Sequence, residues 1–192
     1  MNSEVYMNAS KCTVALLAAL AGVVTCVGLS GAQQSDDPSP VIVTVSDIHL
    51  CCGACVKAVE KAAKIDGVQV QVNKDEGTAV LTAASYEDVQ KSLNEIAKAG
   101  FSGKIEDDTQ AGKVSFPEIK TPSGNVKKLA VRNIHNCCPG CSEAIITAIE
   151  SVDGVSSHTV KPKVAEFVVE GDFDAADVVA VLQDSGFYPT LQ

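Results

Sequence analysis

One short pattern occurs twice in this chain and constrains its architecture more than any other feature. Residues 48–55 (IHLCCGAC) in the first half recur as residues 134–141 (IHNCCPGC) in the second. Further along, Ala99-Gly100-Phe101 recurs as Ser185-Gly186-Phe187. Repeats of this kind indicate duplicated structural units. We therefore expect two similar halves, each with one His and three Cys in the pattern H-x-C-C-x-x-C.

Both halves show the same predicted order of secondary structure. In the first, alternation predicts strands at 41–45, 68–72, 78–82 and 101–105, with helices at 56–65 and, capped by Ser85, up to Gly100. In the second, strands are expected at 126–132, 155–160, 164–169 and 187–191, with helices at 139–152 and after Asp174. This β-α-β-β-α-β order is the ferredoxin-like split βαβ arrangement. The predicted fold class is α+β, with two ferredoxin-like βαββαβ domains in tandem.

The domain boundaries follow from these elements. The first domain is predicted at residues 41–107 and the second at 126–192. Residues 108–125 between them contain Pro117, Pro122, Gly112 and Gly124 among polar residues. That composition is typical of a linker.

The N-terminal segment has a different composition. Lys11 precedes an uncharged apolar run at 12–29, small residues end at Ala32, and a polar segment follows at 33–40. This order predicts a signal peptide at residues 1–32 and an exported protein, periplasmic or secreted. The apolar run is also just long enough to span a bilayer, so an uncleaved membrane anchor is the alternative.

Charge and motif content exclude several functions. The formal net charge is −9, which argues against nucleic acid as a partner because binding its phosphates requires clustered Lys and Arg. The sequence contains no phosphate-binding loop, no nucleophile elbow and no paired catalytic carboxylates in a recognisable context. We therefore expect a binding protein and not an enzyme.

The number and positions of the cysteines indicate that this protein binds metal ions. Of the eight Cys, two lie in the predicted signal peptide and three in each motif. Three Cys cannot all form disulfides within one unit. The pairs Cys52/Cys55 and Cys138/Cys141 lie where a strand leads into a helix, and Pro139 fits the first helical position. Free N–H groups and the helix dipole stabilise thiolates there, so each pair can converge on a soft cation.

The remaining motif residues can add ligands. Cys51 and Cys137 can contribute a third sulfur, and His49 and His135 a nitrogen. Three Cys with one His suit Zn²⁺, whereas two or three thiolates suit Cu(I) or Hg(II). We expect one soft ion per domain, most simply Cu(I) or Zn²⁺. The alternatives are structural disulfides and imidazoles without a ligand role.

At these residues the chain resembles the heavy-metal-associated domains of copper chaperones, metal-transporting ATPases and periplasmic mercury-binding proteins. Their pattern is G-M-x-C-x-x-C after the first strand, followed by an apolar helix that ends in Gly-Val. The CxxC pairs, with Gly67-Val68 and Gly154-Val155 downstream, are similar to it. The resemblance implies the same fold and the binding of copper or another soft metal. This chain departs from the pattern in replacing Gly-Met by His49-Leu50 and His135-Asn136, and in the extra Cys before each pair.

The leading hypothesis is an extracytoplasmic metal chaperone or scavenger for Cu(I), Zn²⁺, Cd²⁺ or Hg²⁺. Such a protein would pass its ion to a thiol-rich partner by ligand exchange. The alternatives are a thiol–disulfide oxidoreductase, because its CxxC also lies at a helix N-terminus, and a structural zinc-bound interaction module.

Overall fold

The computed structural model describes residues 39–106 and 112–192, and these belong to one compact unit. The predicted signal peptide, most of the polar segment after it and the start of the predicted linker lie outside the described residues. In the part that is described, no helix is long and apolar enough to cross a bilayer.

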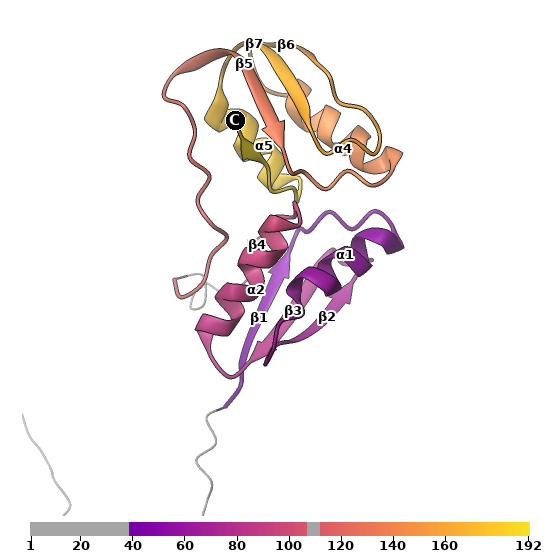
Figure 1. Cartoon of the computed structure of the whole chain (residues 1–192), viewed down its shortest axis with the longest axis vertical. Helices are drawn as coiled ribbons and strands as arrows, with labels where there is room; N and C mark the ends of the chain where they lie inside the picture. Colours follow the sequence, from indigo (N-terminus) through magenta and orange to yellow (C-terminus); the bar gives the residue numbers. More distant parts are fainter. Residues whose placement is uncertain (1–38, 107–111) are drawn as a thin grey trace, which may run out of the picture. The chain divides into compact units, whose positions relative to one another are not determined.

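The first half has the predicted βαββαβ order. Its elements are β1 (Val41–Ser46), α1 (Gly53–Ala63), β2 (Gln69–Asn73), β3 (Thr78–Ala83), α2 (Tyr86–Lys98) and β4 (Lys104–Ile105). The strands form an antiparallel sheet in the order β2-β3-β1-β4. Both helices cover one face of this sheet (Figure 1).

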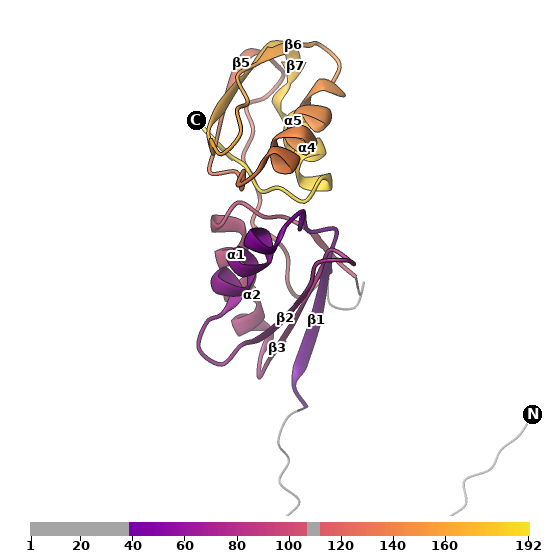
Figure 2. The same cartoon turned by 90° about the vertical axis from the view of Figure 1, so that its right-hand side faces the viewer.

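The second half repeats this arrangement. Its elements are β5 (Asn125–Arg132), α4 (Pro139–Glu150), β6 (Val155–His158), β7 (Phe167–Asp174), α5 (Ala175–Asp184) and β8 (Thr190–Leu191). The sheet order is β6-β7-β5-β8, again antiparallel, with α4 and α5 on one face (Figure 2). The predicted α+β class is confirmed, and each half has the predicted order of elements.

Local sequence signals account for the ends of the second helix in each half. The Ser85 hydroxyl accepts a hydrogen bond from the Asp88 amide (3.2 Å) at the start of α2. The Asp174 carboxylate accepts one from the Ala176 amide (2.8 Å) at the start of α5. Both predicted N-caps are confirmed, since each side chain satisfies a helix N–H that lacks a partner within the helix.

The core of each half lies between the sheet and its helices. As the low aromatic content requires, it is largely aliphatic. In the first half Val43 and Leu81 of the sheet and Val59 and Leu93 of the helices are each at most 1% exposed. Burial of such side chains contributes roughly 1.5–3 kcal/mol each relative to exposure.

The last strand of each half is shorter than predicted. The sequence predicts strands at 101–105 and 187–191, but β4 and β8 contain only their C-terminal portions. The reason is that Phe101 and Phe187 pair with each other in an isolated antiparallel bridge. The residues that start these predicted strands therefore join the two halves to each other.

Backbone hydrogen bonds extend this contact between the halves. The Ser102 amide donates to the carbonyl of Gly186 (3.0 Å), and the Tyr188 amide donates to the carbonyl of Gly100 (3.0 Å). Donors and acceptors occupy equivalent positions in the two halves. The contact is therefore reciprocal.

Glycine is required at both positions. Gly100 and Gly186 have positive φ values of 85° and 82°. A Cβ at Gly100 would lie 2.4 Å from the backbone nitrogen of His135, and one at Gly186 would lie 2.3 Å from that of His49. Each glycine thus ends a helix and also allows the His loop of the other half to approach closely.

Part of the predicted linker packs against the domains. Val114 is only 2% exposed. The side chain of Gln90 in α2 donates to the Ser115 carbonyl (2.7 Å) and accepts from the Ser115 amide (3.0 Å). The Tyr188 hydroxyl donates to the Pro117 carbonyl (3.0 Å). Residues 114–117 of the predicted linker are therefore packed and do not form a free spacer.

The contact between the halves predicts a specific loss of stability. We expect Gly100→Ala and Gly186→Ala each to lower the free energy of unfolding by more than the roughly 1–3 kcal/mol that a strained backbone conformation costs. Gly67→Ala is the matched control, because Gly67 also has a positive φ (79°) but no atom within 4 Å of an added Cβ. Urea unfolding measures all three. Equal losses at Gly67 and Gly100 would contradict the close approach of the halves.

Candidate metal centre

Each CxxC pair lies at a helix N-terminus, as predicted. Cys52 is the N-cap of α1 and Cys138 the N-cap of α4, both with extended backbone. Cys55 and Cys141 lie one turn into these helices and are completely buried. Pro139 occupies the first turn of α4. The sulfurs of each pair converge to 3.7 Å and 3.8 Å.

A tight turn leads each first strand into its motif. Asp47 after β1 and Asn133 after β5 have positive φ values of 56° and 55°. Asp and Asn tolerate this conformation better than most residues. The turns redirect the chain so that Ile48 and Ile134 are buried, and the His and Cys residues follow at the helix N-termini.

The residue after each His is buried in both halves, although the two differ in chemistry. Leu50 is 6% exposed and Asn136 7%. The Asn136 amide donates to the carbonyls of Lys161 (2.9 Å) and Val164 (3.0 Å), and its oxygen accepts from the Ser142 hydroxyl (2.9 Å). A buried amide with these partners avoids the penalty for an unsatisfied polar group. These bonds also hold residues 161–164 as a loop, so β7 begins at Phe167 and not at the predicted residue 164.

The sequence predicts one group of sulfurs in each half, and the structure places the two groups in contact. Each motif sulfur lies 3.2–3.8 Å from at least one other, and all six cysteines are free thiols. Cys52, Cys137 and Cys138 offer sulfurs within 4.8 Å of one another, as do Cys55, Cys137 and Cys141. Three of the groups that could hold an ion therefore combine both halves, counting one that includes His49, while Cys51, Cys52 and Cys55 form a group within the first half.

The two N-cap thiols are the most acidic ones described. Backbone N–H groups of Cys55 and Ala54 lower the pKa of Cys52 to about 6. The N–H of Cys141 and the thiol of Cys51 lower the pKa of Cys138. A thiolate at a helix N-terminus gains from the unpaired N–H groups and the positive end of the dipole.

The pKa values of three other thiols are raised. Partial loss of surrounding water, followed by the contact with Cys138, raises the pKa of Cys51, although part of this side chain stays exposed. The same loss and the contact with Cys55 raise the pKa of Cys137. Burial also raises the pKa of Cys55. The thiols of this centre therefore combine acidic members with protonated neighbours that can donate to them.

The imidazoles are packed between the halves. His49 lies against Phe187 (ring centroids 4.5 Å apart) and His135 stacks on Phe101 (4.1 Å). Desolvation lowers the pKa of both His, which keeps them neutral, the form that binds metals. In both rings Nε2 is buried without a hydrogen-bond partner.

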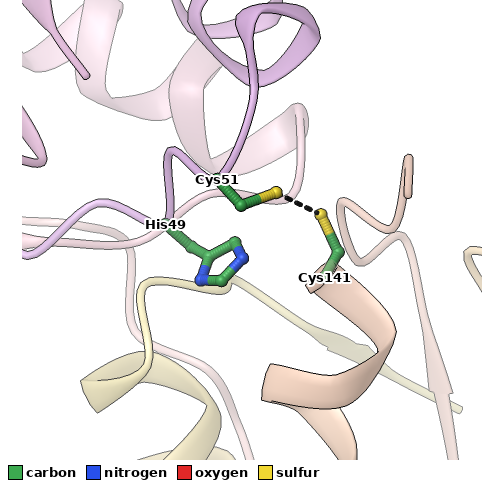
Figure 3. Close-up of side chains that lie close together, drawn as sticks. All are labelled: His49, Cys51 and Cys141. Atoms are coloured by element: carbon green, nitrogen blue, oxygen red, sulfur yellow. Dashed lines mark hydrogen bonds between the residues drawn. The ribbon is translucent and has the colours of Figure 1, made fainter. Parts of the chain in front are cut away.

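The two His differ in their distance from the sulfurs. A ring nitrogen of His49 lies within 4.8 Å of the sulfurs of Cys51 and Cys141. Figure 3 shows this imidazole beside the two sulfurs, which are 3.4 Å apart. His135 joins no such group in the described residues. The structure thus places His49 in the candidate centre and His135 at its edge.

Phe101 and Phe187 are site residues whose role the sequence did not reveal. Their repetition after Gly100 and Gly186 suggested only the start of a strand. In the structure each Phe ring positions the His of the other half. The repeat was the available signal, but its partner across the molecule is a matter of tertiary structure.

These donors suit one class of ligand. Several thiolates with a neutral imidazole form a soft donor set, which favours Cu(I), Zn²⁺ and other thiophilic ions over Mg²⁺ or Ca²⁺. The cysteine groups therefore support heavy-metal binding.

A match to a known protein family agrees with this donor set. Residues 129–187 match the family model "Heavy-metal-associated domain". Among solved structures, the N-terminal soluble domains of Bacillus subtilis CopA are similar at 14% identity and a TM-score of 0.30, over 80% of this chain and 94% of that one. No curated protein matches the chain in sequence. Residues 129–187 in the second half of the chain are thus similar to a heavy-metal-associated domain.

Proposed function

We propose that this protein binds soft heavy-metal ions through its six motif cysteines and transfers or scavenges them, without catalysing a reaction. The observation that carries the proposal is the continuous group of free thiols at two helix N-termini, with neighbouring sulfurs 3.2–3.8 Å apart. Cu(I) is the first candidate ion, and Zn²⁺, Cd²⁺ and Hg²⁺ share the same chemistry. The first half, by its matching element order and motif, acts as a second domain of the same kind.

Accessibility supports a transfer role. Cys51 is exposed, whereas Cys55 and Cys141 are buried. A thiol of a second protein can approach the exposed side of the group and replace one sulfur at a time. We propose that the partner is a thiol-rich, metal-binding protein, and the predicted signal peptide supports an exchange outside the cytoplasm.

Metal binding is tested with Cu(I) and the reduced full chain. We expect the protein to take Cu(I) from a chromophoric Cu(I) chelator. Ser replacement of all four CxxC residues should abolish this competition, because oxygen is a poor ligand for Cu(I). The four residues are Cys52, Cys55, Cys138 and Cys141.

The matched control for the Cu(I) experiment is Cys12→Ser with Cys26→Ser, which removes the two cysteines outside the motifs. This variant should bind Cu(I) as the unaltered chain does. Failure of the unaltered reduced protein to compete for Cu(I), Hg(II) or Zn²⁺ would refute the proposed function.

Thiol reactivity tests the starting state for metal capture, because the thiolate is the form that binds. In the metal-free protein at pH 7, Cys52 should react with iodoacetamide faster than Cys51, since the pKa of Cys52 is about 6 and that of Cys51 is raised. Labelling of Cys52 should fall as the pH drops through about 6, where its thiolate becomes protonated.

Peptide mass spectrometry reports both labelling rates, and one equivalent of Cu(I) should protect Cys52. Labelling that Cu(I) leaves unchanged, together with reduction of insulin by the metal-free protein, would instead indicate thiol–disulfide exchange.

A further inference from the structure

The extra cysteine of each motif lies against the CxxC pair of the other half. The sulfur of Cys137, in the second half, is 3.7 Å from that of Cys52 and 3.5 Å from that of Cys55. Cys52 and Cys55 are themselves 3.7 Å apart. These three sulfurs form a closed triangle in which one corner comes from the other domain.

The reciprocal triangle is also present. The sulfur of Cys51, in the first half, is 3.2 Å from that of Cys138 and 3.4 Å from that of Cys141. Cys138 and Cys141 are 3.8 Å apart. The two triangles touch where each extra cysteine meets the buried sulfur of its own half, at 3.6 Å for Cys51 and Cys55 and at 3.8 Å for Cys137 and Cys141.

Local geometry explains why each extra cysteine lies against the CxxC pair of the other half. Consecutive side chains along an extended backbone point to opposite sides. Cys52 and Cys138 are extended, with φ near −150° and ψ near 170°. The preceding cysteine therefore leaves the backbone on the other side from its N-cap cysteine, and the packing of the halves places the other CxxC pair on that side. The Cys51 and Cys52 sulfurs nevertheless stay within 4.8 Å of each other.

The sulfur spacings fit a particular coordination number. With metal–sulfur bonds of about 2.3 Å, two sulfurs on opposite sides of an ion are about 4.6 Å apart, whereas trigonal or tetrahedral sulfurs are about 3.8–4.0 Å apart. The triangle edges of 3.2–3.8 Å are close to the second arrangement. A small expansion of each triangle admits an ion with three sulfur ligands.

His49 provides an independent observation at the second triangle. Its Nε2 is buried without a partner, and a ring nitrogen lies within 4.8 Å of the sulfurs of Cys51 and Cys141 (Figure 3). The first half thus presents two donors, His49 and Cys51, to the CxxC pair of the second half.

We propose that Cys137 is the third ligand of the Cys52/Cys55 site and that Cys51 is the third ligand of the Cys138/Cys141 site. The protein then has two crossed three-sulfur sites for a thiophilic d¹⁰ ion such as Cu(I) or Hg(II), and each bound ion ties the halves together. This inference rests on the proposed function and specifies its ligands.

The crossing is tested in full-length variants that keep one CxxC pair. The first background carries Ser at positions 12, 26, 138 and 141, so that Cys51, Cys52, Cys55 and Cys137 remain. In it we expect Cys137→Ser to weaken Cu(I) binding at least about tenfold, because loss of a residue that only supports a metal ligand already costs about 10–100-fold in affinity. X-ray absorption at the copper edge should show three sulfur ligands before this change and two after it.

The matched control in this background is Cys51→Ser, which removes the extra cysteine of the same half. It should leave the affinity within about threefold and keep three sulfurs, a difference below the cost of losing a ligand. The mirror background, with Ser at 12, 26, 52 and 55, should reverse the roles of Cys51 and Cys137.

The outcomes separate this inference from the proposed function. Cu(I) binding that weakens with the extra cysteine of the same half, or equally with either one, would overturn the crossing while leaving metal binding intact. Equal loss is also the result expected from a folding defect, so the opposite response in the two backgrounds is required. Absence of Cu(I) binding from both backgrounds and from the unaltered chain would reject the proposed function and the crossing with it.

Discussion

The rest of the candidate centre depends on the reciprocal packing of the two halves at Gly100-Phe101 and Gly186-Phe187. Each glycine lets the His loop of the other half approach to a distance that a Cβ would prevent. Each Phe ring then packs against the His ring of that loop. Because the cysteines follow the His directly in sequence, this contact also sets the separation of the two CxxC pairs. The thiols of the two halves lie close together because the Gly-Phe turns and the His loops beside them pack against each other.

The shifted pKa values of the motif thiols follow from this packing. A thiolate alone at a helix N-terminus would be exposed to water on its other side. Here further thiols lie against it. Desolvation raises the pKa of Cys51 and Cys137, while backbone N–H groups lower the pKa of Cys52 and Cys138. Six thiolates could not coexist at these distances without a cation, since like charges a few ångströms apart repel strongly. A soft metal ion supplies the compensating charge as the protons leave.

The two halves keep one architecture with different local chemistry. Leu50 fills its buried position by apolar packing, whereas Asn136 fills the equivalent one through hydrogen bonds to Lys161, Val164 and Ser142. The hydrogen bonds of Asn136 hold the loop before β7, so this strand begins later than predicted. His49 has two sulfurs nearby, whereas His135 joins no group that could hold an ion in the part of the chain that the structure describes. The duplicated motif therefore carries the same thiols in both halves but distinct surroundings.

The sequence by itself determined the element order, the caps at Ser85 and Asp174 and the position of each CxxC pair, because these depend on local periodicity and on chemistry within a few residues. It also identified the six thiols as the candidate ligands. Only the tertiary structure decided which thiols are neighbours. Phe101 and Phe187 pair across the halves and the linker packs on α2, and neither contact leaves a periodic signal in the chain. Sequence spacing limits which residues of one motif can meet, but the distance between two motifs depends on how the two folded halves pack.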